Sequence, residues 1–476
     1  MRPMMRLGSR RLASSTLALG HRRTLHATAS LPASDLTTDF GKKHVARGLS
    51  RAMDAVIKSG SGSYLEMEDG RKLLDFTCGI AVTNLGHCHP KVSQAAAQQA
   101  MTLVHGQCSV AFSKPYLELI NRLIPIMPHP SLDTFFFWNS GAEAVEASIK
   151  LARSATGRQN VIAMAGGYHG RTYGTMALTR SKTIYSEGMG PLMPGVYVTP
   201  FPYWHQLGLP KNTSEEDLVR HCMHQLNILL SQQTSPGDTA AILVEPLIGE
   251  GGYVAAPPAF LHALREICDK HGIMLICDEV QCGFGRTGKM FFSEYSGVRP
   301  DIMVMAKGLA NGFPLSAIVS KKEIMDKQKP GTMGGTYAGN PVSCAAAIAV
   351  TEAFAQENIL ENVNTRSKQM FSMLHELQRD SEVGKYVLDV RGAGLMVGVE
   401  FASPTASKYD TAKQTDAPEK LASRIVAKCM ENGLMLLTTS VFEVIRFMPP
   451  LNVSEADMAK GCEIFKKAVK DVIREG

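Results

Sequence analysis

Short apolar runs alternate with longer amphipathic stretches between residues 133 and 321, and this alternation restricts the fold more than any other feature. Runs rich in branched and aromatic residues predict buried strands, while apolar residues at helical spacing predict the helices between them. A chain with this order forms a largely parallel sheet that helices cover on both faces. The predicted strands are 134–138, 160–165, 196–199, 240–244, 273–277, 302–306 and 315–320, and the predicted helices are 142–154, 215–230 and 258–270.

The pattern changes after Pro341, where longer helical stretches flank only two strand-like runs. The helical patterns are 345–356, 364–378, 417–431 and 455–473, and the strand-like runs are 395–401 and 444–448. This order predicts a second, smaller α+β domain. Residues 63–68 and 72–76 resemble a hairpin across Asp69-Gly70, which we expect to join that domain. The predicted division is an N-terminal segment 35–85, a large domain 86–340 and a small domain 341–476.

Residues 1–34 differ in composition from the rest of the chain. They contain six arginines, no lysine and no acidic residue. Because the whole chain carries a formal charge of +6, these arginines account for all of the excess and leave the body balanced. An arginine-rich, acid-free start with many Ser, Thr and Ala residues predicts a mitochondrial transit peptide and a matrix location, with a disordered basic tail as the alternative. The balanced body gives no indication of nucleic-acid binding.

The cysteine and histidine patterns indicate neither a disulfide framework nor a metal site. The ten cysteines are scattered without a C-x-x-C pair, which favours free thiols in a reducing compartment. The sequence His87-Cys88-His89 lacks further ligands at recognisable spacing and is more typical of a turn before Pro90. No run of apolar residues is long enough to predict a membrane span.

Two predicted strands end in residues that could share one chemistry. Lys307 follows the run 302–306, and Asp278 follows the run 273–277. A lysine at the mouth of a buried strand is poorly solvated and loses its proton more easily than a surface lysine. An amine and a carboxylate in one crevice suggest an aldehyde cofactor held as a Schiff base, with the acid facing its ring nitrogen. Taken alone, Lys307 is also compatible with an ordinary solvated strand end.

Three further turns follow predicted strands and could line the same crevice. Asn139-Ser-Gly-Ala-Glu-Ala144 opens a helix, and free amides there would suit a phosphate, although a simple Ser-capped helix explains the same residues. Gly166-Gly-Tyr-His-Gly-Arg-Thr172 could place Tyr168 against a flat ring. Glu245-Pro-Leu-Ile-Gly-Glu-Gly-Gly252 offers two carboxylates, of which Glu250 is the stronger candidate for the pocket.

Residues 283–288 match a dinucleotide-binding fingerprint, Gly283-x-Gly285-x-x-Gly288. That fingerprint should open a long helix and be followed by a strand ending in an acid. Pro300 interrupts the chain soon afterwards, so the sequence does not favour a nicotinamide dehydrogenase.

Together these motifs resemble the class III, fold-type I aminotransferases, which use pyridoxal 5′-phosphate. The resemblance extends over roughly residues 45–470. The motifs that carry it are Asp75-Phe, Gly86-His-x-His-Pro90, Asn139-Ser-Gly-Ala-Glu-Ala, Tyr168-His-Gly-Arg, Glu245-Pro with Gly249-Glu-Gly-Gly, Asp278-Glu-Val-Gln, Ala306-Lys-Gly, Gly335-Thr-Tyr-Ala-Gly-Asn-Pro341, Val390-Arg-Gly-x-Gly394 and Ile445-Arg-Phe-Met-Pro-Pro450.

The resemblance implies a cofactor-binding role for residues in each of these turns. Lys307 would attach the cofactor covalently and move a proton as general base and acid. Asp278 would keep the pyridine nitrogen protonated. The remaining implied contacts are Gln281 with the ring hydroxyl, Val280 and Tyr168 on the two ring faces, His169 beside them, and Ser140, Gly141 and Ala142 with the phosphate.

The resemblance also implies a homodimer with a shared active site, because Thr336 would reach the phosphate of the neighbouring subunit. Arg446 matches the family's carboxylate-binding arginine. Glu250 matches an acid that pairs with this arginine when the substrate has no α-carboxylate. Ile80 stands where ornithine aminotransferases have a tyrosine, and Ile248 replaces a common glutamine.

We therefore expect a transaminase that moves an amino group from an ω-amino acid to a 2-oxo acid, with 4-aminobutyrate and 2-oxoglutarate as the leading pair. Class III relatives acting on acetylornithine, β-alanine or alanine and glyoxylate remain alternatives. An aminomutase on the same fold and a non-catalytic relative are less favoured.

Overall fold

The computed structural model describes residues 36–406 and 410–475, so the predicted transit peptide lies outside the described residues. The chain divides into two compact units, one up to Val56 and one from Ile57 onward. Helix α1 (Thr38–His44) is the only helix in the described part of the first unit, and the Thr37 side chain caps it by accepting from the Phe40 amide.

The second unit is built around a seven-stranded sheet in the order β4-β12-β11-β10-β7-β5-β6. Only β12 runs antiparallel to its two neighbours; the other pairs in the sheet are parallel. The strands are β4 (Thr134–Trp138), β5 (Asn160–Met164), β6 (Val196–Thr199), β7 (Thr239–Val244), β10 (Met274–Asp278), β11 (Ile302–Met305) and β12 (Ser316–Ser320). The predicted strands and the largely parallel sheet are confirmed.

Strand β7 shows why this sheet must be covered on both faces. All six of its residues are buried. Successive side chains point to opposite faces, so Ile242 and Val244 pack in one apolar cluster with Phe260, while Ala241 and Leu243 pack in another. A strand that is apolar on both faces is stable only between two layers of helices.

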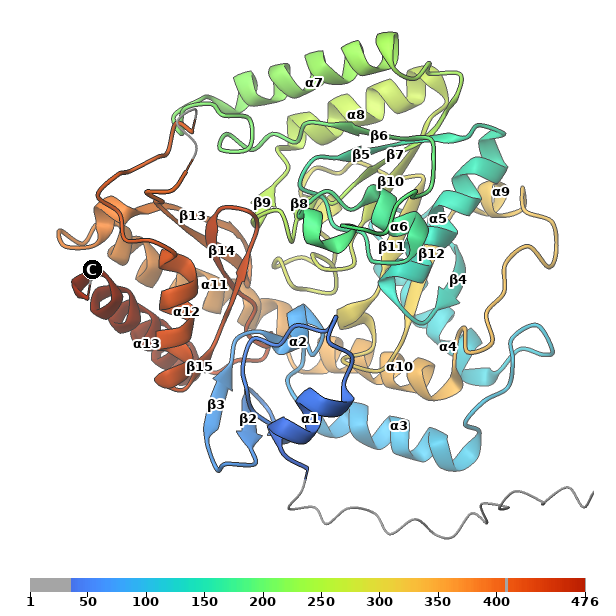
Figure 1. The fold of residues 1–476 in the computed structure, drawn as a ribbon. Helices are drawn as coiled ribbons and strands as arrows, with labels where there is room; N and C mark the ends of the chain where they lie inside the picture. Colours follow the sequence, from blue (N-terminus) through green and yellow to red (C-terminus); the bar gives the residue numbers. More distant parts are fainter. Residues whose placement is uncertain (1–35, 407–409, 476) are drawn as a thin grey trace, which may run out of the picture. The chain divides into compact units, whose positions relative to one another are not determined.

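The covering helices follow from this requirement (Figure 1). Helices α7 (Glu215–Gln232) and α8 (Pro258–His271) supply the first cluster, and α5 (Gly141–Thr156) supplies the second. The other helices of the large part are α3 (Pro90–Thr102), α4 (Lys114–Leu123), α6 (Tyr173–Leu178), α9 (Lys322–Met325) and α10 (Pro341–Gln356).

The C-terminal part has the predicted α+β character. Its sheet has the order β13-β14-β17-β16, and it packs with α11 (Ile359–Gln378), α12 (Leu421–Glu431) and α13 (Glu455–Arg474). The strands are β13 (Val387–Ala393), β14 (Met396–Phe401), β16 (Leu437–Thr439) and β17 (Glu443–Phe447). The predicted helix 417–431 begins only at Leu421, because Lys420 has a left-handed φ of 53° that a helix cannot continue through.

A third sheet joins the two ends of this unit in the order β1-β2-β3-β15. The strands β2 (Tyr64–Met67) and β3 (Lys72–Asp75) pair antiparallel, which confirms the predicted hairpin. β1 (Ile57–Ser61) pairs with β2, and β15 (Leu434–Met435) pairs with β3. The domain boundaries at 85 and 340 stay predictions. Within the described residues, no helix is long and apolar enough to cross a membrane.

Candidate active site

A cavity of about 450 Å³ lies at the carboxyl edge of the central sheet. Parallel strands end at the same edge, and this is where open α/β sheets bind ligands. The pairing of Asp278 with Val304 places the end of β10 beside the end of β11, directly before Lys307. The predicted residues that line the cavity are Ser140, Gly141, Ala142, Tyr168, His169, Glu250, Asp278, Val280, Gln281 and Lys307.

Lys307 leaves β11 in an unusual conformation, with a left-handed φ of 46°. A non-glycine residue in this region is held there by its surroundings, and such residues cluster at functional sites. Removal of the ammonium from water, helped by the charge of Arg446, lowers the pKa of Lys307 to about 8, although Glu250 and Asp278 oppose the shift. The amine is therefore far more available as a nucleophile than that of a surface lysine.

Asp278 is buried and held by two neighbours. One carboxylate oxygen accepts from the Val280 amide at 3.0 Å, and the other lies 2.8 Å from His169 Nδ1. Burial disfavours the imidazolium, yet the hydrogen bond and charge of Asp278 raise the pKa of His169 overall. The ring's Nε2 is buried with no hydrogen-bond partner among the described residues.

The N-terminus of α5 forms one end of the cavity. Ser140 and Glu143 form a capping box: the Glu143 amide donates to Ser140 Oγ at 3.3 Å, and the Ser140 amide donates to Glu143 Oε2 at 2.8 Å. The amides of Gly141 and Ala142 have no acceptor within the helix and can bind an anion. A Cβ at Gly141 would lie 3.1 Å from Val280 Cγ1, so glycine lets the helix end approach that side chain closely.

Glu245 has a larger structural role than the sequence indicated. Its carboxylate accepts from the Tyr168 amide at 2.7 Å and from the Gly249 amide at 2.9 Å. Burial, opposed by the charge of His169, raises the pKa of Glu245 to about 7. The side chain joins two turns of the cavity wall, and its position at the end of β7 was the only sequence signal for that role.

Glu250 lines the cavity and forms a buried ion pair with Arg446, which is not itself a lining residue. Burial alone would disfavour both charges, but their mutual attraction lowers the pKa of Glu250 and raises that of Arg446. The Nε of Arg446 is buried and has no partner in the described part of the chain. This arginine therefore retains unused capacity to bind a carboxylate.

Arg171 is a cavity residue that the sequence analysis missed. Its Nε donates to the Tyr168 hydroxyl at 3.1 Å, and its guanidinium lies 4.6 Å from the centre of the Tyr185 ring. Within the described residues it has no acidic partner. A guanidinium at a cavity without a carboxylate of its own can receive one from a ligand. Its place in the Tyr168-His-Gly-Arg motif was the available signal.

Three predicted site residues, Ile80, Thr336 and Arg446, are not among the residues that line the cavity. Of these, Arg446 is paired with the lining residue Glu250. Ile80 is 40% exposed and has a φ of 69°, a strained value for a branched side chain. Thr336 is exposed on the segment before α10. Their predicted contacts, with the substrate and with a neighbouring subunit's phosphate, stay predictions.

Comparison with known proteins agrees with this geometry. The family model described as Aminotransferase class-III matches residues 45–469. The chain belongs to the class-III aminotransferase family. It is 40% identical over 402 residues to the 4-aminobutyrate aminotransferase of Escherichia coli (strain K12), which covers 84% of this chain and 89% of that protein. It is 38% identical to the 5-aminovalerate aminotransferase of Pseudomonas putida, over 90% of this chain and 96% of that protein.

A comparison with solved structures supports the same family fold. A transaminase structure from directed evolution by ancestral reconstruction superposes with a TM-score of 0.84 at 26% identity, over 92% of this chain and 98% of that one. The protein is a fold-type I transaminase, and its cofactor is pyridoxal 5′-phosphate.

The cavity wall of this class-III aminotransferase suits that cofactor. The buried Gln281 Oε1 and His169 Nε2 have no partner among the described residues, and both side chains line the cavity. Free amides at the start of α5 suit the phosphate, and the Lys307 amine suits the aldehyde. Asp278 supplies the negative charge that a protonated ring nitrogen requires.

Proposed function

We propose that this transaminase takes the terminal amino group of a straight-chain ω-amino acid and transfers it to a 2-oxo acid, with 4-aminobutyrate and 2-oxoglutarate as the leading pair. The observation that carries the proposal is the buried Glu250–Arg446 pair. Relatives named for 4-aminobutyrate and 5-aminovalerate support the same class of donor.

The charge of Arg446 explains why Glu250 matters for such a donor. The carbon that carries the amino group of an ω-amino acid has no carboxylate, so Arg446 would face it uncompensated. A buried unpaired charge is costly, and Glu250 supplies the missing negative charge. When glutamate or 2-oxoglutarate binds, its α-carboxylate takes that place, and the Glu250 side chain moves away.

The far carboxylate of either substrate needs a second cation. Arg171 meets this requirement because it lines the cavity and has no acidic partner within the described residues. Its contacts with Tyr168 and Tyr185 hold the guanidinium in place at the cavity wall. We propose that Arg171 binds the distal carboxylate in both half-reactions.

When bound, pyridoxal phosphate supplies an aldehyde for the amino group and a ring that accepts electrons from the substrate carbon. Lys307, once released, would take the proton from that carbon and return it as an acid, a role suited to a pKa of about 8. Asp278, held by His169, would maintain the charge opposite the ring nitrogen. The two arginines orient the substrate.

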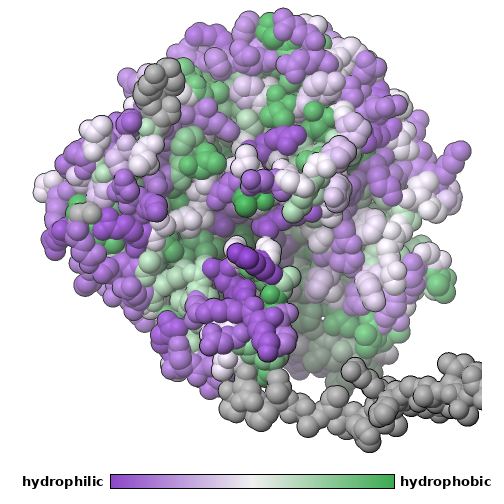
Figure 2. Space-filling model, in the orientation of Figure 1, coloured by the Kyte–Doolittle hydropathy of each residue, from purple (hydrophilic) through white to green (hydrophobic). Residues whose placement is uncertain are grey.

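We also propose that the enzyme acts as a homodimer. An exposed apolar patch surrounds the segment after α3, with Met101 82%, Val110 85% and Phe112 76% exposed. Figure 2 shows hydrophobic residues at the lower right of the visible face, where Figure 1 places α3 and the loop that follows it. Exposed apolar surface of this kind marks protein interfaces. Charged substitutions at Val110 and Phe112 should give a monomer by light scattering, with weaker cofactor binding if Thr336 acts across the interface.

The composition of residues 1–34 supports a mitochondrial matrix location. The test is a fusion of this segment to a fluorescent reporter. Import of the reporter, abolished when the six arginines are replaced by glutamine, would support the proposal, and diffuse fluorescence of the unaltered fusion would contradict it.

The donor class can be tested by single half-reactions of the loaded enzyme. The cofactor absorbance is followed after addition of 4-aminobutyrate, 5-aminovalerate, N-acetylornithine or ornithine, without any 2-oxo acid. We expect conversion by the first two donors to be fastest. A response to N-acetylornithine or ornithine alone would overturn the proposal, and continued turnover without a 2-oxo acid would indicate an aminomutase.

A further inference from the structure

We propose that Arg391, which lies outside the cavity lining, is a positioning residue that sets Glu250 opposite Arg446 and so determines the preference for ω-amino acids. This inference rests on the proposed function, because it concerns the donor half of that reaction. It is carried by the main-chain contacts of the loop that holds Glu250 and by the register of the C-terminal sheet.

The Glu250 loop connects the short strands β8 (Leu247–Ile248) and β9 (Val254–Ala255). Its main chain is held at Glu250 itself and again at Gly252. The carbonyl of Glu250 accepts from the Ser440 amide at 2.9 Å and from Thr439 Oγ1 at 3.1 Å. Two residues later, the Gly252 carbonyl accepts two hydrogen bonds from one guanidinium, from Arg391 Nε at 3.0 Å and Nη2 at 2.7 Å.

The sheet places this guanidinium and that of Arg446 on either side of the loop. Arg391 on β13 and Arg446 on β17 are both paired with Gly398 on β14. Directly paired residues point to the same face, so the two arginines project side by side with Gly398 between them. Neighbouring strands are separated by roughly 4.8 Å, which leaves about 10 Å between the two arginine positions for the loop.

Glycines allow the loop to rest in this space. A Cβ at Gly398 would lie 3.1 Å from Tyr253 Cβ and 3.2 Å from the Gly252 carbonyl oxygen. A Cβ at Gly252, whose φ is +127°, would lie 3.1 Å from Arg391 Nη2. A side chain at either position would push the loop from the sheet or from Arg391. The loop is thus seated over Gly398, with its main chain tied to Arg391 and its Glu250 side chain tied to Arg446.

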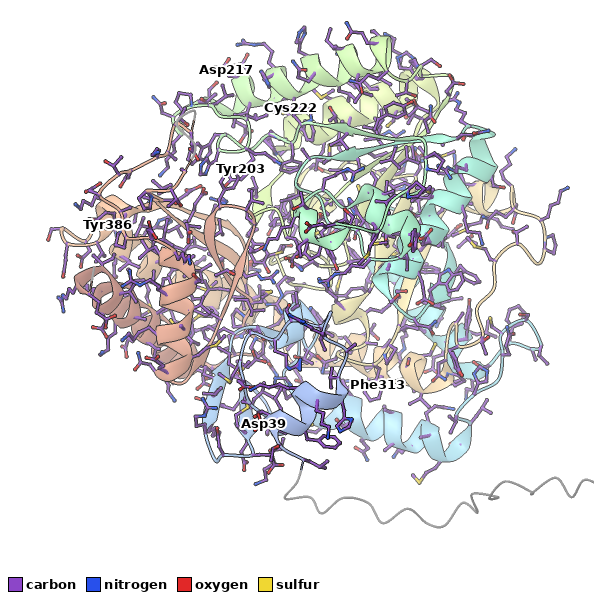
Figure 3. All side chains as sticks on the ribbon, viewed as in Figure 1. Asp39, Tyr203, Asp217, Cys222, Phe313 and Tyr386 are labelled. Carbon is purple, nitrogen blue, oxygen red and sulfur yellow. The ribbon has the colours of Figure 1, made fainter. Side chains whose placement is uncertain are left out.

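Arg391 is itself held by several side chains, most of them buried. It pairs with Glu400 and with Asp389 at 3.2 Å, and its guanidinium lies 4.8 Å from the centre of the Tyr203 ring. Tyr203, labelled in Figure 3, follows β6 and donates its hydroxyl hydrogen to Glu400 at 2.7 Å. His205 contacts the other oxygen of Glu400 through Nδ1. Burial opposes ionisation of Glu400, but Arg391 and His205 hold its pKa at about 2.

The contacts of Arg391 and those of Arg446 have different consequences for the Glu250 loop. Arg391 fixes the loop main chain, so movement of Glu250 is restricted to its side chain. Arg446 has only Glu250 as a charged partner among the described residues, so that pair can open when a substrate carboxylate arrives. If Arg391 lost its hydrogen bonds to the Gly252 carbonyl, the loop would move and the Glu250–Arg446 ion pair would form less often. Only the donor half-reaction would then lose the negative charge that compensates Arg446.

The test is Arg391→Lys, which keeps the charge but cannot donate two hydrogen bonds to one carbonyl from a rigid fork. Single-turnover rate constants are measured for 4-aminobutyrate and for glutamate. We expect the ratio of the 4-aminobutyrate rate constant to the glutamate rate constant to fall about tenfold, which corresponds to ~1.4 kcal/mol. The fall should come from a lower rate constant for 4-aminobutyrate. Cofactor absorbance and the glutamate rate should match the parent. Glu400→Gln, which leaves Arg391 in place but weakens its hold, should shift the ratio in the same direction.

A matched control is Arg265→Lys on α8. Arg265 also joins a carboxylate, Asp301 at 2.8 Å, to a main-chain carbonyl, that of Arg299 at 3.3 Å, but it does so at the other edge of the sheet. This variant should leave the ratio unchanged.

The decisive comparison is the double variant Arg391→Lys with Glu250→Ala. If Arg391 acts through Glu250, the double variant has the same ratio as Glu250→Ala alone. An equal loss in both half-reactions, or an additive shift in the double variant, would overturn the inference. Failure of the parent to convert any ω-amino acid would instead overturn the proposed function.

Discussion

The two ends of the cavity differ in how firmly their charges are held. At the cofactor end, Asp278 has two fixed partners, His169 and the Val280 amide, in addition to any bound ring. At the substrate end, Glu250 and Arg446 have each other as their direct ionic partner in the described residues, and Arg446 Nε has none. This difference fits the proposed division of labour. The residues that serve both half-reactions are held by fixed partners, and the residues proposed to select the substrate form a pair that can separate.

The strongest test of this division is Lys307→Ala. If Lys307 attaches the cofactor and moves the proton in both half-reactions, as proposed, both rates should fall by about 10³-fold or more. The absorbance of the bound cofactor should change as well. The control is Lys289→Ala, a lysine outside the cavity lining that contacts the Tyr295 ring. Parent-like absorbance in Lys307→Ala would remove the assignment of this lysine.

The next effect concerns Asp278→Asn, which keeps the shape of the side chain but removes its charge. The protonated ring nitrogen would lose its counter-charge, so we expect both half-reactions to slow by roughly 10²-fold. Rapid-mixing measurements with 4-aminobutyrate and with glutamate would show this. A loss confined to one substrate would contradict the view that the cofactor end serves both.

These cofactor-end residues were predictable because strand ends are visible in a sequence. Asp278 and Lys307 close apolar runs, and once the strands are parallel neighbours the two ends must meet. The antiparallel direction of β12 was not predictable from its apolar composition, which fits either direction.

The residues around Arg391 that hold the Glu250 loop could not be predicted, for a different reason. Arg391 and Glu400 stand within strands, where a single charge reads as a solvent-facing residue. Only the tertiary packing of Tyr203 and His205 over the C-terminal sheet buries them. The left-handed φ of Ile80 is likewise not visible in the sequence, because a branched residue rarely adopts this conformation. The proposed contact of Thr336 involves a second subunit, whose position no pattern within one chain can give.

Arg171→Met should have a smaller and more selective effect at the substrate end. Loss of hydrogen bonds to a carboxylate should raise the KM for 4-aminobutyrate about tenfold. Conversion of n-butylamine, which lacks the carboxylate, should proceed at the parent's rate. If both amines lost activity equally, Arg171 would have a general structural role instead.

The smallest effect is the pH dependence of cofactor uptake. The neutral amine of Lys307 reacts with the aldehyde, and its pKa of about 8 lies below the usual 10.5. The uptake rate of the cofactor-free enzyme should therefore rise about fivefold from pH 7 to pH 8 and level off above pH 9. A rate that still rises tenfold per unit at pH 9 would show an unperturbed lysine.

The measurement that tests the account most directly is the pair of single-turnover rates in Glu250→Ala. The account predicts that the rate with 4-aminobutyrate falls by roughly 30-fold or more, because Arg446 is left as an unpaired buried charge, while the rate with glutamate stays close to the parent's. Equal losses with the two substrates would contradict the claim that Glu250 and Arg446 switch between them.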